Sequence, residues 1–501
     1  MKLKTTLFLA ATLLITLPSF SQDGSLDLSF GIGGKVITPI GIGQDYVGGM
    51  VLQPDGKIIM VGNTDANSDF GYALVRYNPD GTLDPGFGTL GKVIPDISNN
   101  DSLGAVALQP DGKIVVAGST RVGSYPSFIT MRYLNDGTLD YSFGNNGQVV
   151  QGFGESAYAN SLIIQQNGKI IVGGSYFINY QYGGAMVRYN TDGTLDSTFG
   201  SQGSTTVSMG PEINGGNATS LVLQGGKIVM GGRSLLSSNT DFALTRLSEN
   251  GTQDATTFGT TTDFSGTNDS VFDLAVQPNG RIIAVGTAGG TGFAVARYGI
   301  SGVLDNSFGS GGKIVTTFEN GGNDWASAVA IQNDNKILVA GRSADNFAVA
   351  RYNINGSLDP TFGTDGKVIT PVDVYSRPGA MLIQPDGKIL VGGSSYNGTN
   401  WDFCITRYNA TPLANSAFEA TIATHIFPNP VSANGTLFCN TSFEDITLDI
   451  FNTIGQKIKH IDHFSGDRIA LNPIDFKDGF YYIRMTGENK LLFTSKFFVK
   501  N

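Results

Sequence analysis

Cysteine and histidine are scarce in this chain of 501 residues. Two cysteines, Cys404 and Cys439, are too few for a disulfide framework, so the fold must be held together by its packed core. All three histidines, His425, His460 and His463, lie near the C-terminus. The residues before His425 therefore contain no imidazole for a Ser-His-Asp triad or a histidine-ligated zinc site.

Charged residues are also few, and positive charge is the scarcer sign. They make up 15% of the chain, against about 25% in an average soluble protein, and the formal net charge is −10. Binding to phosphates requires clustered Lys and Arg side chains. We therefore expect no nucleic-acid partner.

Apolar runs long enough to span a membrane are missing as well. The run from Leu7 to Leu17 falls short of the ~20 residues that a spanning helix needs. It follows Lys2 and Lys4 and precedes Ser19-Phe20-Ser21, an order typical of a secretory signal peptide. We predict a signal peptide over 1–21, no transmembrane segment, and a mature protein that is soluble or surface-attached.

What the chain does contain is glycine, 68 residues of it, and a sevenfold repeat. The segment Gln-Pro-Asp-Gly-Lys-Ile returns in recognisable form at Gln53, Gln109, Gln165, Gln224, Gln277, Gln332 and Gln384. An Arg, usually followed by Tyr, recurs at Arg76, Arg132, Arg188, Arg246, Arg297, Arg351 and Arg407. A Leu-Asp-x-x-Phe-Gly signature recurs with its acid at Asp27, Asp84, Asp140, Asp196, Asp254, Asp305 and Asp359. Such a period indicates a repeat architecture.

Each repeat is expected to form four short strands. Residues 102–109 and 113–118 flank Asp111-Gly112, which favours a tight hairpin. Two further strands are expected over 128–133 and 147–150. Four-stranded units repeated in this way are typical of β-propellers.

The two ends of the repeated region predict how the ring closes. Residues 34–38 form a lone fourth strand before the first hairpin, and the fourth strand is missing after Arg407-Tyr408-Asn409. We predict an all-β fold with a seven-bladed β-propeller over 22–409, closed by the N-terminal strand so that no open edge remains.

The repeats resemble the delta-60 repeat, a β-propeller family without an assigned function. The resemblance covers residues 24–409 through the Leu-Asp-x-Ser-Phe-Gly, Gln-Pro-Asp-Gly-Lys-Ile and Ala-Arg-Tyr-Asn elements. The fifth signature departs from the pattern, with Gln253 in place of Leu and one extra residue. We therefore expect a poor fourth strand over 260–265.

The C-terminal part has a different composition. After an Ala- and Thr-rich linker at 410–424, short strands alternate with Gly, Asn and Asp turns, which predicts a small Ig-like β-sandwich over 425–501. Phe427-Pro428-Asn429-Pro430 and the Gly479-Phe480-Tyr481-Tyr482-Ile483 strand resemble the type A sorting domain of the type IX secretion system. The resemblance implies the type IX machinery as a partner, followed by release or attachment to surface polysaccharide; an ordinary accessory domain is the alternative.

Function is expected on the propeller face that carries the variable loops, because variable loops on a repeated scaffold usually determine binding. We predict a binding or scaffold module for a polysaccharide, glycan or protein ligand. The candidate ligand-binding residues are aromatic: Tyr176, Phe177, Tyr180, Tyr182, Trp325, Tyr375, Tyr396 and Trp401. Aromatic rings stack on sugars and anchor peptides, but they also simply cover loop backbones.

Two other types of chemistry are conceivable on this face. An oxygen-bearing side chain marks the entry to each innermost strand, at Asp45, Asp101, Asn160, Asn217, Asp269, Asp324 and Asp373. These side chains either contribute to a Ca²⁺ site or cap their own loops. A polysaccharide- or peptide-active enzyme that uses paired carboxylates is the alternative function, but the sequence singles out no catalytic residue among Asp65, Asp69, Glu155, Glu212 and Asp241.

The recurring Arg and Asp are expected to be structural. An Arg inside an apolar strand needs a partner, and the Asp of the following turn offers one. The predicted pairs are Arg76 with Asp84, Arg132 with Asp140, Arg188 with Asp196, Arg297 with Asp305, Arg351 with Asp359 and, across the ring closure, Arg407 with Asp27.

Overall fold

The computed structural model describes residues 22–65, 71–95, 101–210, 215–236, 239–254, 258–264, 266–318, 323–410, 424–427, 431, 435–452, 456–472, 475–487 and 490–500. The predicted signal peptide, Asp69, Glu212 and most of the predicted linker lie outside these ranges. The chain divides into two compact units, 1–412 and 413–501. No helix in the described part of the chain is long and apolar enough to cross a membrane.

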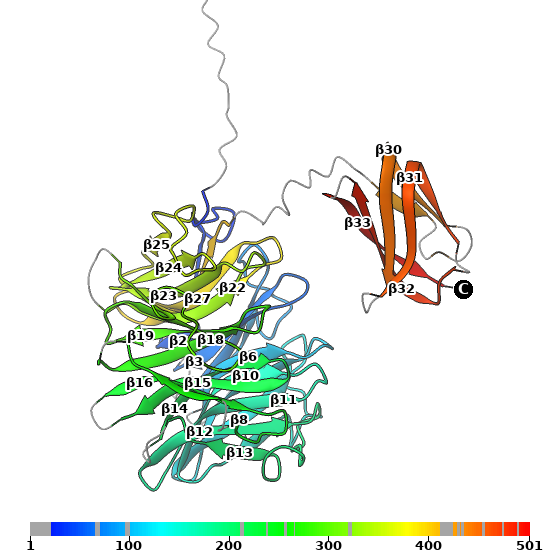
Figure 1. The fold of residues 1–501 in the computed structure, drawn as a ribbon. Coiled ribbons are helices and arrows are strands. Elements are labelled where there is room, and N and C mark those ends of the chain that lie inside the picture. Colours follow the sequence, from blue (N-terminus) through cyan, green and yellow to red (C-terminus); the bar gives the residue numbers. More distant parts are fainter. Residues whose placement is uncertain are drawn as a thin grey trace, which may run out of the picture. The chain divides into compact units, whose positions relative to one another are not determined.

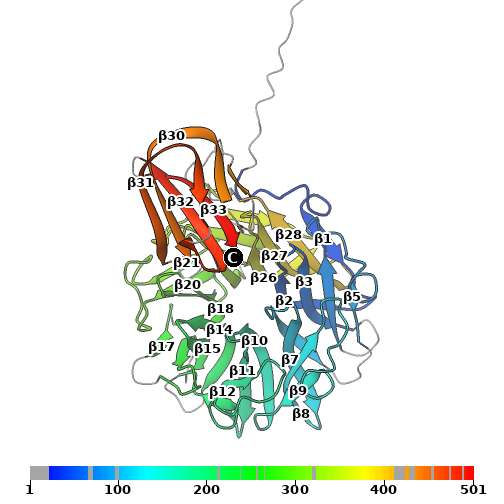
Figure 2. The ribbon, with the colours of Figure 1, turned by 90° about the vertical axis from the view of Figure 1, so that its right-hand side faces the viewer.

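The first unit is the predicted seven-bladed β-propeller, and each blade is a four-stranded antiparallel sheet (Figures 1 and 2). Blade 1 holds β2 (Asp45–Leu52), β3 (Ile58–Thr64), β4 (Gly71–Tyr77) and β5 (Lys92–Val93). Blade 2 holds β6 (Ser102–Leu108), β7 (Ile114–Val122), β8 (Tyr125–Tyr133) and β9 (Gln148–Gln151). Blade 3 holds β10 (Ser156–Ile164), β11 (Ile170–Ile178), β12 (Gln181–Tyr189) and β13 (Ser204–Val207).

The other four blades repeat this order. Blade 4 holds β14 (Gly216–Gln224), β15 (Lys227–Leu235), β16 (Thr240–Leu247) and β17 (Gly259–Thr262). Blade 5 holds β18 (Asp269–Val276), β19 (Ile282–Ala288), β20 (Phe293–Tyr298) and β21 (Lys313–Thr316). Blade 6 holds β22 (Trp325–Ile331), β23 (Ile337–Ser343), β24 (Asn346–Tyr352) and β25 (Lys367–Thr370). Blade 7 holds β26 (Tyr375–Ile383), β27 (Ile389–Tyr396), β28 (Trp401–Tyr408) and β1 (Lys35–Thr38).

The fourth strand of blade 4 corrects the expectation for the irregular repeat. β17 pairs with β16 over four residues, from Phe242↔Thr262 to Thr245↔Gly259, as in the regular blades. Phe258 of the altered signature is buried like its counterparts in the other repeats. The strand therefore keeps its place although the signature holds one extra residue.

Ring closure joins the two ends of the propeller, as predicted. β1 pairs with β28 in antiparallel register from Lys35↔Thr406 to Thr38↔Phe403. The preceding turn continues the contact, because the Gly24 N–H donates to the Asn409 carbonyl at 2.7 Å. Blade 7 is thus completed by the N-terminal segment, and its outer edge is occupied.

Apolar residues fill the spaces between blades. One core cluster joins Phe30, Met50 and Met60 to Phe403 and Ile405, so blades 1 and 7 pack against each other across the closure. The innermost strands, which Figure 2 shows around the centre of the ring, each contain one register irregularity. This β-bulge shifts the alternation of side chains in the second half of each innermost strand.

The second unit has its own core. Its sheet contains β29 (Thr424–Phe427), β30 (Gly435–Asn452), β31 (Lys457–Leu471), β32 (Gly479–Gly487) and β33 (Lys490–Val499). The buried cluster includes Leu448, Ile450 and Ile483. The unit is all-β, as predicted, and its Ig-like arrangement stays a prediction.

Candidate functional site

One end of the blade 7 sheet brings three of the predicted ligand-binding aromatics together. Tyr375, Tyr396 and Trp401 are cross-strand neighbours at the ends of β26, β27 and β28. Their ring centroids lie 5.8 Å and 5.5 Å apart. The Tyr375 side of this row is the more open one, since Tyr375 is 42% exposed.

Two residues that the sequence analysis did not select extend this row. The Tyr46 ring from blade 1 lies 5.9 Å from the Trp401 ring. The Arg377 guanidinium lies over the Trp401 ring, 4.8 Å from its centroid, as in a cation–π contact. Tyr46 and Arg377 hold the same register position in β2 and β26, so aligning the repeats would have found both.

Polar groups surround these rings. The hairpin tip of blade 7 reaches blade 1, where Asn400 donates to the Gly43 carbonyl at 2.9 Å. Asn397 and Asn400 also donate to the carboxylate of Asp402. Burial and the nearby charge of Asp373 raise the pKa of Asp402. We name Tyr46, Tyr375, Arg377, Tyr396 and Trp401 the blade 7 aromatic site.

Trp325 stands apart from this site among the described contacts. It lies at the start of β22 in blade 6, where the Arg342 guanidinium stacks 4.9 Å from its ring centroid. Arg342 also pairs with Asp345. The ring is therefore partly covered by its own blade.

The aromatics of blade 3 divide between two sides of the blade. Phe177 contacts Tyr182 at 4.6 Å and Tyr180 at 6.3 Å, and Tyr180 is 89% exposed at the hairpin tip. Tyr176 alternates to the opposite side of β11 and packs against the core shared with blade 2. We name Phe177, Tyr180 and Tyr182 the blade 3 aromatic site.

Four of the residues considered for Ca²⁺ share one structural position. Asp45 and Asp269 are the first residues of β2 and β18, Asp101 and Asp324 directly precede β6 and β22, and each of the four is at least 96% buried. Asp45 accepts the Ile40 N–H at 2.8 Å, Asp269 accepts the Phe264 N–H at 2.8 Å and Asp324 accepts the Phe318 N–H at 3.1 Å. These three carboxylates cap the loop that enters their blade, which is the alternative to a Ca²⁺ role.

The other three residues of that set do not share this position. Asn160 is the bulged residue of β10, Asn217 pairs with Arg233 one position further along its strand, and Asp373 is exposed before β26. The equivalent positions carry Ala157, Gly216 and Ser376. No complete ring of oxygen ligands therefore forms at the described entries.

The carboxylates considered for an enzyme lie on different blades. Asp65 follows β3 of blade 1 and accepts the Gln44 N–H, whereas Glu155 precedes β10 of blade 3. Asp241 of blade 4 lies near Asp263, which follows β17, and Asp269, the first residue of β18 in blade 5, and their ligand atoms all lie within 4.8 Å of one another. That is closer than the about 5 Å or more between the paired acids of glycosidases.

The Asp-Gly hairpins and the Leu-Asp-x-x-Phe-Gly turns lie on the propeller face opposite the variable loops, which we name the repeating face. This face has a regular ion-pair network. Each recurring Arg contacts the Asp of its turn at 2.6–2.9 Å, including Arg246 with Asp254 and Arg407 with Asp27. A second cation, which the sequence analysis did not assign, comes from the Gln-Pro-Asp-Gly-Lys-Ile hairpin at 2.7–3.1 Å, as in Lys388 with Asp27. Each Asp thereby ties the second and third strands of its blade to the turn.

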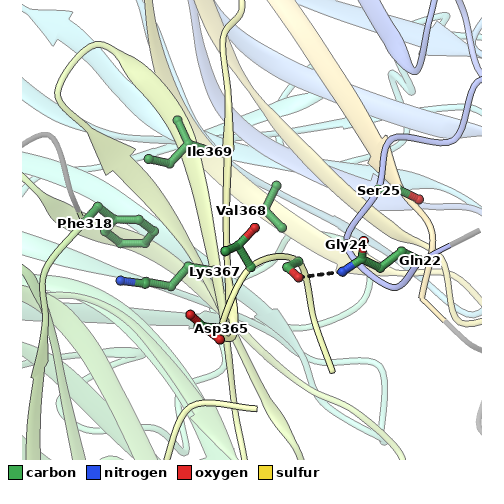
Figure 3. Close-up of a pocket in the computed structure, with 10 residues that line it drawn as sticks. Gln22, Gly24, Ser25, Phe318, Asp365, Lys367, Val368 and Ile369 are labelled. Atoms are coloured by element: carbon green, nitrogen blue, oxygen red, sulfur yellow. Dashed lines mark hydrogen bonds between the residues drawn. The ribbon is translucent and has the colours of Figure 1, made fainter. Parts of the chain in front are cut away.

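A pocket lies at the ring closure, away from both aromatic sites. It has a volume of about 420 Å³ and is lined by the first residues of the described chain and by β25 (Figure 3). Gln22 donates to the Gly363 carbonyl at its edge, at 2.7 Å. At this pocket the N-terminal end of the propeller supplies a turn of the repeat to the C-terminal blades. None of the predicted ligand-binding residues lines the pocket.

Asp273 is an acid in the middle of an innermost strand that the sequence analysis missed. It accepts hydrogen bonds from Ser220 of blade 4 at 3.0 Å and from the Val329 N–H of blade 6 at 2.9 Å. Burial raises its pKa to about 6, although these hydrogen bonds oppose the rise. The matching residue of blade 3 is Ser161, whose hydroxyl accepts the Leu221 N–H at 3.1 Å.

We expect Asp273→Ser to remove a pH-dependent cost of folding. Because the folded-state pKa is raised, Asp273 favours the folded state below about pH 4 and loses that contribution as the pH rises through about 6. The variant should therefore gain on the order of 2 kcal/mol relative to the wild type between about pH 4 and pH 7.5. Urea unfolding across this range measures the difference, and a constant difference would contradict the prediction.

Comparison with solved structures gives low identities. A virginiamycin B lyase from Staphylococcus aureus, crystallised with quinupristin, is 11% identical with a TM-score of 0.47, covering 74% of this chain and 98% of the lyase. YCF48 bound to a D1 peptide is 14% identical with a TM-score of 0.42, covering 76% of this chain and 96% of YCF48. At these values the likeness supports no statement about function. No curated protein matches the chain.

Family models match both units. Seven segments match a family described as "domain of unknown function (DUF5122) beta-propeller", at residues 53–87, 109–143, 165–199, 226–256, 277–308, 332–362 and 384–411. Residues 425–500 match a "secretion system C-terminal sorting domain", which indicates type IX export to the secreted or cell-surface-attached state. The chain therefore contains seven DUF5122 β-propeller repeats and a C-terminal secretion sorting domain.

Proposed function

We propose that the propeller is an extracellular binding module whose ligand contacts the variable-loop face. The blade 7 aromatic site is the observation that carries the proposal. It combines a row of contacting rings with an Arg that has no carboxylate partner among the described residues. Such clusters of Tyr, Trp and Arg are typical of binding surfaces.

Charge and hydrogen bonding at the site also support binding. Asn397, Asn400 and Gln44 are held by neighbouring groups, so the loop around the rings is preorganised. A preorganised site loses less conformational entropy when a ligand binds. Among the described acids of this face, Asp45, Asp269 and Asp324 cap loops, and the cluster of Asp241, Asp263 and Asp269 is closer than the paired acids of glycosidases.

The double variant Tyr375→Ser/Tyr396→Ser is expected to weaken ligand binding at least about 10-fold, because it removes the exposed end of the row. A protein of residues 22–415 is first screened on glycan and peptide arrays, with and without Ca²⁺. The amounts of the variant and of the unmodified protein that the bound ligand retains are then compared. Tyr141→Ser is the matched control, since Tyr141 is 73% exposed in a turn of the repeating face. Equal retention of all three proteins would exclude the blade 7 aromatic site as the binding surface.

A further inference from the structure

Blades 3 and 7 carry aromatic pairs at the same structural position. Phe177 pairs with Tyr182 across β11 and β12, and Tyr396 pairs with Trp401 across β27 and β28. Both pairs lie two residues beyond a serine that contacts the next blade: Ser175 accepts the Ala218 N–H at 3.0 Å and Ser394 accepts the Val47 N–H at 2.9 Å. The two aromatic pairs therefore face the same way around the ring.

The described residues of other blades lack such a pair. The corresponding positions carry Arg121 with Pro126 in blade 2 and Leu235 with Thr240 in blade 4. In blades 5 and 6 the second and third strands end before this position. The repeat thus supplies the framework, and two blades add the rings.

Both sites also have an exposed side and hydrogen-bonding groups. Tyr180 is 89% exposed and Tyr182 is 40% exposed in blade 3, and Tyr375 is 42% exposed in blade 7. Tyr158 of β10, which is 50% exposed, occupies the register position that Arg377 has in β26. Each site therefore offers aromatic faces next to polar groups.

These groups favour a neutral sugar polymer as the ligand. Aromatic faces pack on the apolar faces of pyranose rings, and phenol, amide and guanidinium groups hydrogen-bond to hydroxyls. The carboxylates of Asp373 and Asp402 beside the blade 7 site disfavour a polyanion, because like charges repel.

Blades 3 and 7 are separated by blades 1 and 2 in one direction and by blades 4, 5 and 6 in the other. The two sites therefore lie on different sides of the ring, and a short oligosaccharide fills only one. We propose that the propeller binds neutral polysaccharide bivalently, through the blade 3 and blade 7 aromatic sites. This inference rests on the proposed function and names its ligand class.

Bivalence has a measurable signature. A protein of residues 22–415 is run in native gels that contain xylan, mixed-linkage β-glucan, galactomannan or the polyanion alginate, and a polymer that binds it slows its migration. Calorimetry with the hexasaccharide of that polymer then gives the number of binding sites. We expect two hexasaccharides per propeller in the unmodified protein. Phe177→Ser/Tyr182→Ser and Tyr375→Ser/Tyr396→Ser should each leave one, and each should weaken polymer binding at least about 10-fold through lost avidity.

The controls separate this inference from the proposed function. Tyr141→Ser should keep both hexasaccharides, and circular dichroism should be the same for all variants. One hexasaccharide per propeller, lost only in the blade 7 variant, would overturn bivalence and leave the proposed function standing. The polysaccharide assignment would be overturned if alginate alone slowed the protein, if none of the polymers slowed it, or if the protein bound only peptides on the array.

Discussion

Arg407→Ala is expected to destabilise the propeller by about 3 kcal/mol, because it breaks a buried ion pair at the ring closure. Arg407 is 6% exposed, and its Nε lies 2.8 Å from the carboxylate of Asp27, 380 residues away. Its Nη1 also donates to the Pro79 carbonyl of blade 1 at 2.5 Å. One side chain thus connects the N-terminal turn, blade 7 and blade 1.

The effect has a specific electrostatic origin. Burial raises the pKa of Asp27, but hydrogen bonds from Lys388 and Ser29 and the charge of Arg407 outweigh it and hold the pKa well below its ordinary value. Without Arg407 the buried carboxylate retains only part of this compensation. Thermal and urea unfolding of residues 22–415 measures the loss.

Arg121→Ala is the matched control for Arg407→Ala. Arg121 is exposed at the end of β7, so its truncation should change the free energy of unfolding by no more than about 0.5 kcal/mol. An Arg407→Ala variant as stable as this control would show that the closure does not depend on the ion pair.

Deleting residues 425–501 is expected to abolish export and leave a folded propeller in the periplasm. The two units have separate cores, so we expect the propeller to fold without the sorting domain. Cell fractionation with an antibody against the propeller locates the protein, and its thermal transition reports folding. Truncated protein in the medium would contradict the sorting role.

A point variant tests the same role without shortening the chain. Ile483→Asp places a charge in the core of the sorting domain, where Ile483 is fully buried, and should unfold that domain alone. The variant should stay in the periplasm with an unchanged propeller transition. Arg468→Ala, at a side chain that is 66% exposed, should be exported normally.

The sequence predicts the fold better than the candidate site, for a physical reason. The Gln-Pro-Asp-Gly-Lys-Ile and Leu-Asp-x-x-Phe-Gly elements recur because every blade needs the same turns, so the strand order and the pairing of Arg407 with Asp27 could be anticipated. Tyr46 and Arg377 were missed because the repeat signatures do not include their register position, although Trp325 holds the same position in β22. Contacts between blades depend on which side of a strand faces the neighbour.

Bulges explain the misplacement of Asn160 and the failure to find Asp273. Asn160 has the right chemistry for a loop cap, but it lies at the irregularity of β10 and donates to the Ala218 carbonyl of the next blade at 2.8 Å. Asp273 follows the corresponding irregularity in β18, so alternation from the strand start gives the wrong side for it. Alternation read from a strand start fails beyond a bulge.

The division of one blade between the two ends of the propeller has a consequence for biosynthesis. β1 is among the first segments to be synthesised, but its partner β28 and the acceptor of the Gly24 N–H are among the last of the propeller. Contacts between residues so far apart in sequence form slowly, because a long loop must close first. The final blade therefore cannot assemble until almost the whole propeller has left the ribosome, and until then β1 has no strand to pair with.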